Sequence, residues 1–284
     1  MFSYLVPLLA VALFFYSPIV EILTGRSAPP KQIRRTPLPP INKDLLALEA
    51  TNRSTGPSSC GTDSYSIHVF SREPLVIYIE NFISLEERTH LLEISDPIFE
   101  PSTVTHDGGD STLRDTTVRD SEVAVIPRTD VVRCIEDRAR AFQGWRDKVW
   151  IERLRVQRYH AGGHYNHHFD WSSSRGGWGR VSSFMAWVDD DEGQLQGGGT
   201  EFPLLRPRPD PRWCSFVECR NATEASEQHA GGVVFRPLAG NAVYWENFRS
   251  DNTGRGYDQT WHAGLPVENG VKVGLNIWSW GRIE

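Results

Sequence analysis

The segment from Tyr159 to Trp171 contains a His-x-Asp pair, His168 and Asp170, within a stretch of strand-like composition. Side chains at positions i and i+2 of a strand point to the same face, so we expect the His168 imidazole and the Asp170 carboxylate to converge. A third candidate ligand, His262, follows later in the chain. Two histidines and one carboxylate that leave coordination positions open are typical of non-haem Fe(II) sites. We therefore predict that these three residues bind iron.

A basic residue follows in a segment where apolar and mixed positions alternate. The apolar face consists of Val271, Val273, Leu275 and Ile277, and the mixed face of Lys272, Gly274, Asn276, Trp278 and Trp280. This alternation predicts a strand whose apolar face packs on a core and whose mixed face lines a pocket. A buried ammonium group is costly without an anion, so we expect Lys272 to bind an acidic ligand.

The neighbouring histidines have to be separated from the predicted ligands. His167 points to the opposite strand face from His168, so it should not bind the same metal. We place His160 and His164 at the rim of the site, because they lie beside a glycine pair. A histidine-rich zinc cluster is the competing interpretation, but zinc does not explain Lys272.

Taken together, these residues resemble the catalytic core of the prolyl 4-hydroxylase family of 2-oxoglutarate dioxygenases. The further matching pieces, in the order of the family, are Tyr159 with Gly162-Gly163, Tyr165, the segment Gly198–Pro203 and the segment Gly240–Trp245. The resemblance extends from about Leu75 to Trp280. A single His-x-Asp pair arises easily by chance, whereas the ordered set is specific.

The resemblance implies a mainly β fold with flanking α-helices around a double-stranded β-helix, or jelly-roll, core. It also implies an Fe(II)- and 2-oxoglutarate-dependent dioxygenase that hydroxylates peptidyl-proline, as procollagen-proline 4-dioxygenases do, and converts 2-oxoglutarate to succinate and CO₂. The expected cofactors and co-substrates are Fe²⁺, 2-oxoglutarate, O₂ and L-ascorbate, and the expected partner is a proline-containing peptide or protein.

The same resemblance assigns roles to individual pocket residues. Lys272 would bind the distal carboxylate of 2-oxoglutarate, with Tyr159 and Thr200 as hydrogen-bond donors to the same end. Tyr165 matches a position on the peptide-binding side. Trp278 shares a strand face with Lys272, so it either walls the substrate side of the pocket or packs in the core.

Three other functions remain open. The same mechanism could act on another residue or on a small molecule, since only the loops at the pocket mouth would differ. An inactive binding module could keep the fold, although the intact set of predicted ligands argues against it. A zinc hydrolase is the third alternative, and dependence on 2-oxoglutarate would separate it from the oxygenases.

Length and composition are those of a folded domain with an additional N-terminal segment. The chain has 284 residues, and its net charge of −6 argues against a nucleic-acid-binding protein. Residues 1–24 form an apolar stretch that predicts a membrane anchor, with a cleaved signal segment as the alternative. Residues 25–63 are rich in proline and basic side chains and predict a linker. Residues 64–284 are the predicted dioxygenase domain, with a catalytic core at about 151–282 and a loop insertion at 206–232.

The orientation of the predicted anchor is suggested by modification signals. Asn52 and Asn221 lie in glycosylation acceptor sequences, which favours the lumen of the endoplasmic reticulum. The basic residues that follow the apolar stretch argue for the opposite orientation, by the positive-inside rule. We expect a single-pass protein of the endoplasmic reticulum membrane with a luminal catalytic domain, or a secreted protein if the N-terminal segment is cleaved.

The four cysteines allow three pairings in an oxidising compartment. Cys214 and Cys219 are the local choice, which would leave Cys60 to pair with Cys134. Two helices are expected before the metal segment. One begins with a capping-box pattern at Ser84, and the other is expected to be capped by Asp130.

Overall fold

The computed structural model describes residues 44–48, 60–61, 64–105, 112–174, 177–219, 232–251 and 253–283, which all belong to one unit, Pro40–Glu284. The predicted anchor or signal segment (1–24) and the predicted glycosylation sites, Asn52 and Asn221, lie outside the described residues. Within those residues, no helix has the length and apolar character needed to cross a membrane.

Strands make up most of the domain. They are β1 (Ser66–Arg72), β2 (Leu75–Glu80), β3 (Glu100–Pro101), β4 (Val104–Thr105), β5 (Thr112–Leu113), β6 (Arg119–Asp120), β7 (Glu122–Val125), β8 (Val149–Ile151), β9 (Arg155–Tyr159), β10 (His164–His168), β11 (Trp178–Asp189), β12 (Gln196–Gly197), β13 (Thr200–Phe202), β14 (Val233–Phe235), β15 (Ala242–Glu246), β16 (His262–Gly264), β17 (Val267–Asn269) and β18 (Lys272–Arg282). The α-helices are α2 (Leu85–Ser95) and α3 (Asp130–Phe142), and the 3₁₀ helices are η2 (Asp96–Ile98), η3 (Asp170–Ser173), η4 (Asp191–Gly193), η5 (Pro211–Ser215) and η7 (Asp258–Thr260).

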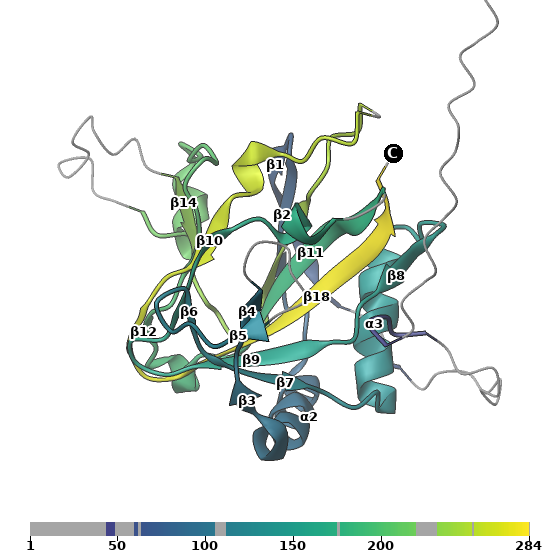
Figure 1. The fold of residues 1–284 in the computed structure, drawn as a ribbon. Helices are drawn as coiled ribbons and strands as arrows, with labels where there is room; N and C mark the ends of the chain where they lie inside the picture. Colours follow the sequence, from purple (N-terminus) through teal and green to yellow (C-terminus); the bar gives the residue numbers. More distant parts are fainter. Residues whose placement is uncertain are drawn as a thin grey trace, which may run out of the picture. The chain divides into compact units, whose positions relative to one another are not determined.

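The strands form two main antiparallel sheets. The larger sheet has the order β1-β2-β15-β11-β18-β9-β7-β3, with β8 also paired to β18, and the smaller has the order β14-β13-β16-β10-β6. Figure 1 shows α2 and α3 on one side of the long strands, with the smaller sheet on the other. This arrangement confirms the predicted mainly β, jelly-roll fold with flanking helices.

Each face of the larger sheet packs against its own hydrophobic cluster. On the helix side, Leu91 of α2 and Ile135 of α3 pack with Leu275 of β18, and all three are fully buried. Between the sheets, Trp187 of β11 packs with Phe202 of β13 and other aromatic side chains. Burial of these apolar surfaces is the main force that holds helices and sheets together.

The two helices begin as their sequences dictate, with one correction. Ser84 forms the predicted capping box. Its hydroxyl accepts a hydrogen bond from the Glu87 backbone N–H, and the Glu87 carboxylate accepts one from the Ser84 backbone N–H. The predicted cap at Asp130 is wrong. The cap is Thr129, whose hydroxyl accepts from the Val132 backbone, and Asp130 is the first helical residue, where its charge still complements the helix dipole.

Two disulfides, Cys60–Cys134 and Cys214–Cys219, contain all four cysteines, which confirms the predicted pairing. The first ties the chain before β1 to α3. Further upstream, Leu46 is buried and forms a β-bridge with Glu152. Packed residues of the domain are therefore already present within the segment that the sequence predicts to be a linker.

Candidate metal site

The two predicted histidine ligands come from adjacent strands of the smaller sheet, and Asp170 follows directly after one of them. His168 is the last residue of β10, and it is the direct partner of His262 at the start of β16. The i, i+2 argument assumed that Asp170 lies on the same strand as His168. Instead, Asp170 is the first residue of the 3₁₀ helix η3. The residue between, Phe169, is still extended (φ −109°, ψ 131°), so the carboxylate turns toward the His168 side.

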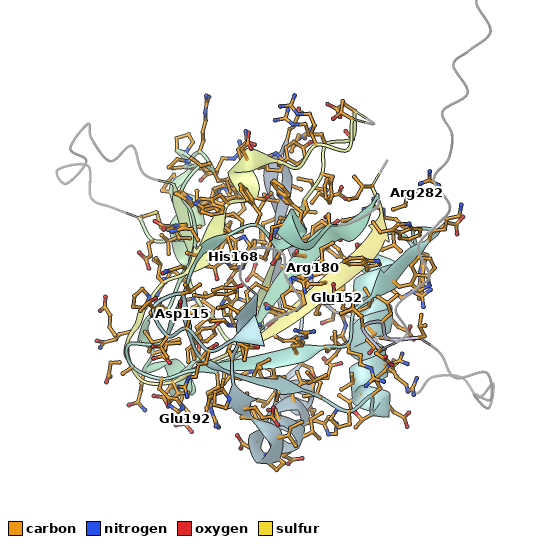
Figure 2. All side chains as sticks on the ribbon, viewed as in Figure 1. Asp115, Glu152, His168, Arg180, Glu192 and Arg282 are labelled. Atoms are coloured by element: carbon orange, nitrogen blue, oxygen red, sulfur yellow. A yellow bond between two sulfur atoms is a disulfide. The ribbon has the colours of Figure 1, made fainter. Side chains whose placement is uncertain are left out.

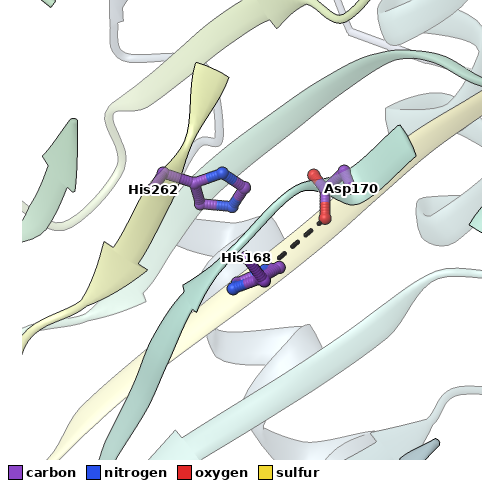
Figure 3. A group of neighbouring side chains, drawn as sticks. All are labelled: His168, Asp170 and His262. Atoms are coloured by element: carbon purple, nitrogen blue, oxygen red, sulfur yellow. Dashed lines mark ion pairs between the residues drawn. The ribbon is translucent and has the colours of Figure 1, made fainter. Parts of the chain in front are cut away.

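The candidate ligand atoms converge on one point (Figure 3). One atom from each of the three side chains lies within 4.8 Å of the others. His168 Nε2 is 3.7 Å from Asp170 Oδ1, and the two imidazole centroids are 4.3 Å apart. Among the described residues, this is the one group of three or more histidine, cysteine or acidic side chains whose ligand atoms lie close enough together to hold a metal ion.

Backbone carbonyls orient both imidazoles toward this point. His168 Nδ1 donates to the Asn166 carbonyl at 2.8 Å, and His262 Nδ1 donates to the Thr260 carbonyl at 2.8 Å. Each ring therefore presents Nε2 as the nitrogen that can bind a metal. A hydrogen bond from the second ring nitrogen is the usual arrangement at metal-binding histidines, because it fixes the tautomer and the ring orientation.

The Asp170 carboxylate is held from behind. Its Oδ2 accepts hydrogen bonds from Ser183 Oγ at 2.6 Å and from Trp278 Nε1 at 3.0 Å. Burial opposes ionisation of this group, but the neighbouring His262, His168 and Arg180, together with the Ser183 hydrogen bond, hold the pKa of Asp170 below its usual value. The site therefore contains a preoriented anionic ligand.

The electrostatics of His168 also suit a metal ligand. Burial and the neighbouring His262 lower its pKa to about 3, so the imidazole is neutral at physiological pH. A neutral imidazole is the form that binds metals. Two histidines and one carboxylate fit a divalent iron, and the donor set leaves coordination positions for other ligands.

A pocket opens beside the three ligands. Its lining residues are Gln157, Tyr159, Tyr165, His168, Asp170, Met185, Thr200, Trp245, His262, Gly264, Lys272 and Asn276. The predicted mixed face of β18 thus contributes Lys272 and Asn276. Val273, Leu275 and Ile277 point away into the helix-side core, which confirms the predicted alternation.

Lys272 is a buried cation in this pocket. It is 2% exposed, and burial lowers its pKa to about 7. Its Nζ donates to the Gly198 carbonyl at 2.5 Å, and no carboxylate of the described residues lies within ion-pair distance. An ammonium group without an anionic partner fits a ligand that brings its own carboxylate.

Of the other predicted pocket residues, three line the pocket and one does not. Tyr159 and Thr200 both line the pocket, and the Lys272 ammonium lies 5.2 Å from the centre of the Tyr159 ring. Tyr165 lines the pocket and stacks on His168, with ring centroids 3.8 Å apart. Trp278 is not part of the lining, because it lies behind Asp170 as a hydrogen-bond donor.

Sequence reasoning missed Gln157. This buried side chain lines the pocket, and its Oε1 accepts a hydrogen bond from the Tyr159 hydroxyl at 3.0 Å. Its Nε2 has no hydrogen-bond partner in the described part of the chain. Gln157 lies two residues before Tyr159 on β9, so strand alternation could have predicted that it shares the pocket face with Tyr159. His167, in contrast, points outward as predicted and pairs with Glu201 at 2.8 Å.

Comparison with known proteins finds similarity to one family model and to solved structures. Residues 154–280 match the model of the 2OG-Fe(II) oxygenase superfamily. "Probable prolyl 4-hydroxylase 3" of Arabidopsis thaliana is 29% identical over 251 residues, which are 84% of this chain and 80% of that protein. "Prolyl 4-hydroxylase 5" of the same plant is 26% identical over 251 residues, or 83% and 78% of the two chains.

The structural likeness agrees with this match. The crystal structure of the viral collagen prolyl hydroxylase vCPH from Paramecium Bursaria Chlorella virus-1, in its 2OG complex, is 21% identical to this chain. The match covers 78% of this chain and 99% of that chain with a TM-score of 0.50. At this identity, the likeness concerns the fold alone.

Proposed function

We propose that this chain hydroxylates proline residues of peptides or proteins while converting 2-oxoglutarate to succinate and CO₂, on the basis that residues 154–280 match the model of the 2OG-Fe(II) oxygenase superfamily. The observation that carries the proposal is the convergence of His168, Asp170 and His262 beside the buried Lys272 in one pocket. The prolyl 4-hydroxylases among the relatives support proline as the target.

The residues of this chain would bind and orient the reactants. His168, Asp170 and His262 would hold Fe²⁺, and Lys272 would pair with the distal carboxylate of 2-oxoglutarate. The iron, when bound, supplies the O₂ activation that no side chain can perform. Ascorbate would return iron to the divalent state after cycles without substrate.

Aromatic side chains contact both predicted histidine ligands. Tyr165 covers one face of His168, and Phe202 and Trp245 lie against His262, with ring centroids 5.4 and 4.9 Å from the imidazole. These contacts fix the ligand rings.

The test is mass spectrometry of proline-containing peptides incubated with the protein, Fe²⁺, 2-oxoglutarate and ascorbate, with succinate measured in the same reaction. We expect proline to gain one oxygen in step with succinate, and both signals to disappear in Asp170→Ala. The matched control is His160→Ala, because His160 is a largely exposed histidine outside the ligand cluster. Absence of succinate from iron-loaded protein under all conditions would refute the enzymatic assignment.

We also propose that the catalytic domain functions in the lumen of the endoplasmic reticulum, attached to the membrane by residues 1–24. The two disulfides support an oxidising compartment, since such bonds are rare in the cytosol. Protease protection in microsomes, together with a glycosidase-sensitive mass shift that is lost in Asn52→Gln and Asn221→Gln, tests the orientation. An unglycosylated, protease-accessible domain would contradict it.

A further inference from the structure

Three arginines from three different strands lie against the two aromatic rings that contact the predicted metal ligands. We call Arg119 of β6, Arg155 of β9 and Arg180 of β11 the arginine wall. The Arg119 guanidinium lies 4.6 Å from the centre of the Tyr165 ring. The guanidinium groups of Arg180 and Arg155 lie 3.6 and 5.6 Å from the centre of the Trp278 ring.

The two aromatic rings connect the arginine wall to the metal ligands. Tyr165 stacks on His168, and the Trp278 indole donates to Asp170. Arg180 itself comes within 3.9 Å of Asp170 Oδ1. Figure 2 shows Arg180 near the middle of the domain, close to its partner Glu152. Arg180 therefore lies beside a predicted metal ligand, and Arg119 and Arg155 are each separated from the ligands by one aromatic ring.

The arginine wall and Lys272 lie at opposite ends of the site along β18. Lys272 pairs with Tyr159, whereas Asn276 pairs with Arg155 and Trp280 with Arg180. If Lys272 binds the distal end of 2-oxoglutarate, as proposed above, the co-substrate occupies the pocket from that end. The arginine end is then the side from which the carbon to be hydroxylated approaches the metal.

The positive charge of the wall is only partly compensated. Arg180 forms a two-fold hydrogen-bonded ion pair with Glu152, at 2.8 and 3.0 Å. In the part of the chain that the structure describes, Arg119 donates to the Ser121 hydroxyl, but its Nη2 is buried without a hydrogen-bond partner. The same is true of Arg155 Nε. No described carboxylate lies within ion-pair distance of Arg119 or Arg155.

These uncompensated donors carry an energetic cost. A buried donor without an acceptor loses the hydrogen bond that it made to water, which makes an incoming acceptor favourable. Burial lowers the pKa of Arg155, and the positive charges of Arg180 and Arg119 act in the same direction against the opposing effect of Glu152. A planar guanidinium matches a carboxylate with two parallel hydrogen bonds. The geometry and the charge of the wall thus fit a carboxylate ligand.

We propose that the peptide substrate carries an aspartate or glutamate next to the proline that is hydroxylated, and that Arg119 and Arg155 bind this carboxylate. Arg180 stays paired with Glu152 and does not bind the substrate carboxylate directly. The proposal rests on the proposed function and narrows its substrate class from proline-containing peptides to acidic ones.

The test compares peptides of equal length in which the residue on either side of one proline is glutamate, glutamine or lysine. We expect kcat/KM for oxygen incorporation to be about tenfold or more higher for the glutamate peptide than for the glutamine peptide, because a hydrogen bond to a charged group is worth more than a neutral one. The lysine peptide should be poorest. The preference should decrease with added salt, because the wall is only partly buried.

Variants assign the preference to the wall. Arg155→Gln should reduce the ratio of glutamate to glutamine peptide toward one, and Arg155→Lys should keep part of it because the charge is retained. Arg212→Gln is the matched control, since Arg212 is highly exposed and pairs with Asp210 away from the site. An undiminished ratio in Arg155→Gln would overturn the assignment to the wall.

Failure of the substrate preference can be distinguished from failure of the proposed function. Equal oxidation of glutamate and glutamine peptides by the native protein refutes only the acidic preference. If no peptide gains oxygen, the proline hydroxylase assignment fails. The acidic preference is then decided by fluorescence anisotropy, which measures the binding affinity of the same peptides carrying a fluorescent label. Equal affinities for the glutamate and glutamine peptides would refute the preference. Oxidation of free L-proline in place of the peptides would contradict the acidic-peptide assignment, because the amino acid brings its own carboxylate.

Discussion

Replacing Lys272 by methionine should separate the cost of burying this ammonium group from its role in binding. Burial lowers the pKa of Lys272 from 10.5 to about 7. One pKa unit corresponds to 1.36 kcal/mol, so the folded, ligand-free protein pays on the order of 5 kcal/mol to keep this side chain charged. Methionine has a similar length and carries no charge, so it removes that cost without opening a cavity.

The pH dependence of stability follows from the direction of this shift. Between about pH 7 and 10.5 the unfolded chain holds a proton on Lys272 that the folded chain has released. Stability rises with pH wherever the unfolded state binds more protons. The free energy of unfolding of the ligand-free protein should therefore increase as the pH rises above 7. This increase should be absent from Lys272→Met. Below pH 7 the variant should be the more stable protein.

Binding should change in the opposite direction. The 2-oxoglutarate carboxylate would pair with the charged form of Lys272, and a hydrogen bond to a charged group contributes about 1.5–3 kcal/mol. Lys272→Met should therefore bind the co-substrate about 10- to 150-fold more weakly. In the native protein, affinity should decrease by up to tenfold per pH unit above 7, because binding then requires uptake of a proton.

Calorimetric titration of the Mn²⁺-loaded protein with 2-oxoglutarate measures both affinity and proton uptake, when it is repeated at pH 6.5 and 8.5 in buffers of different ionisation enthalpy. Urea unfolding of the metal-free protein gives the stability. Lys148→Met is the matched control, since Lys148 is exposed. Unchanged affinity in Lys272→Met, or a loss of stability at pH 6.5, would show that this lysine supports the fold and does not bind the co-substrate.

Three further predictions follow from contacts around the site. Ser183→Ala removes the 2.6 Å hydrogen bond to Asp170, and it should weaken Fe²⁺ binding about 10- to 100-fold in a chelator competition, whereas unchanged affinity would mean that Trp278 alone orients the carboxylate. Gln157→Leu removes a buried donor without a partner among the described residues, so its free energy of unfolding should stay within about 1 kcal/mol of the native value. KM for 2-oxoglutarate should rise several-fold, and an unchanged KM would exclude a contact between Gln157 and the co-substrate. Loss of the Cys60–Cys134 disulfide, which has a sequence separation of 74, should lower the free energy of unfolding in urea by about 2–4 kcal/mol, and an unchanged midpoint would contradict the constraint.

The sequence predicted the parts of the site that depend on strand periodicity. Lys272 and the alternating residues after it lie on β18 as expected, because burial of one face of a strand fixes every second side chain. The same rule gave the correct outcome at His168 and Asp170 for an incomplete reason. The strand ends at His168, and Asp170 reaches the site from the first residue of a 3₁₀ helix.

The residues that sequence reasoning missed act through contacts between distant strands. Gln157 enters the pocket because β9 pairs with β18, so that Gln157 faces Gly274. The arginine wall combines residues from β6, β9 and β11, whose proximity depends on the order of strands in two sheets. A pattern within one segment predicts which face a side chain occupies, but it does not predict which side chains of other segments share that face.

The two cationic ends of the site differ in a way that their chemistry explains. Lys272 can release its proton, so the ligand-free protein tolerates it in a buried pocket near neutral pH. Arginine stays charged under all physiological conditions, so Arg180 needs a permanent anion, and Glu152 supplies it: the ion pair raises the pKa of Arg180 although burial opposes this. Arg155 has no such partner among the described residues and keeps a buried donor unsatisfied. The end of the site that binds a small keto acid can therefore be neutral until the acid arrives, whereas the arginine end remains positively charged and should select its substrate by charge.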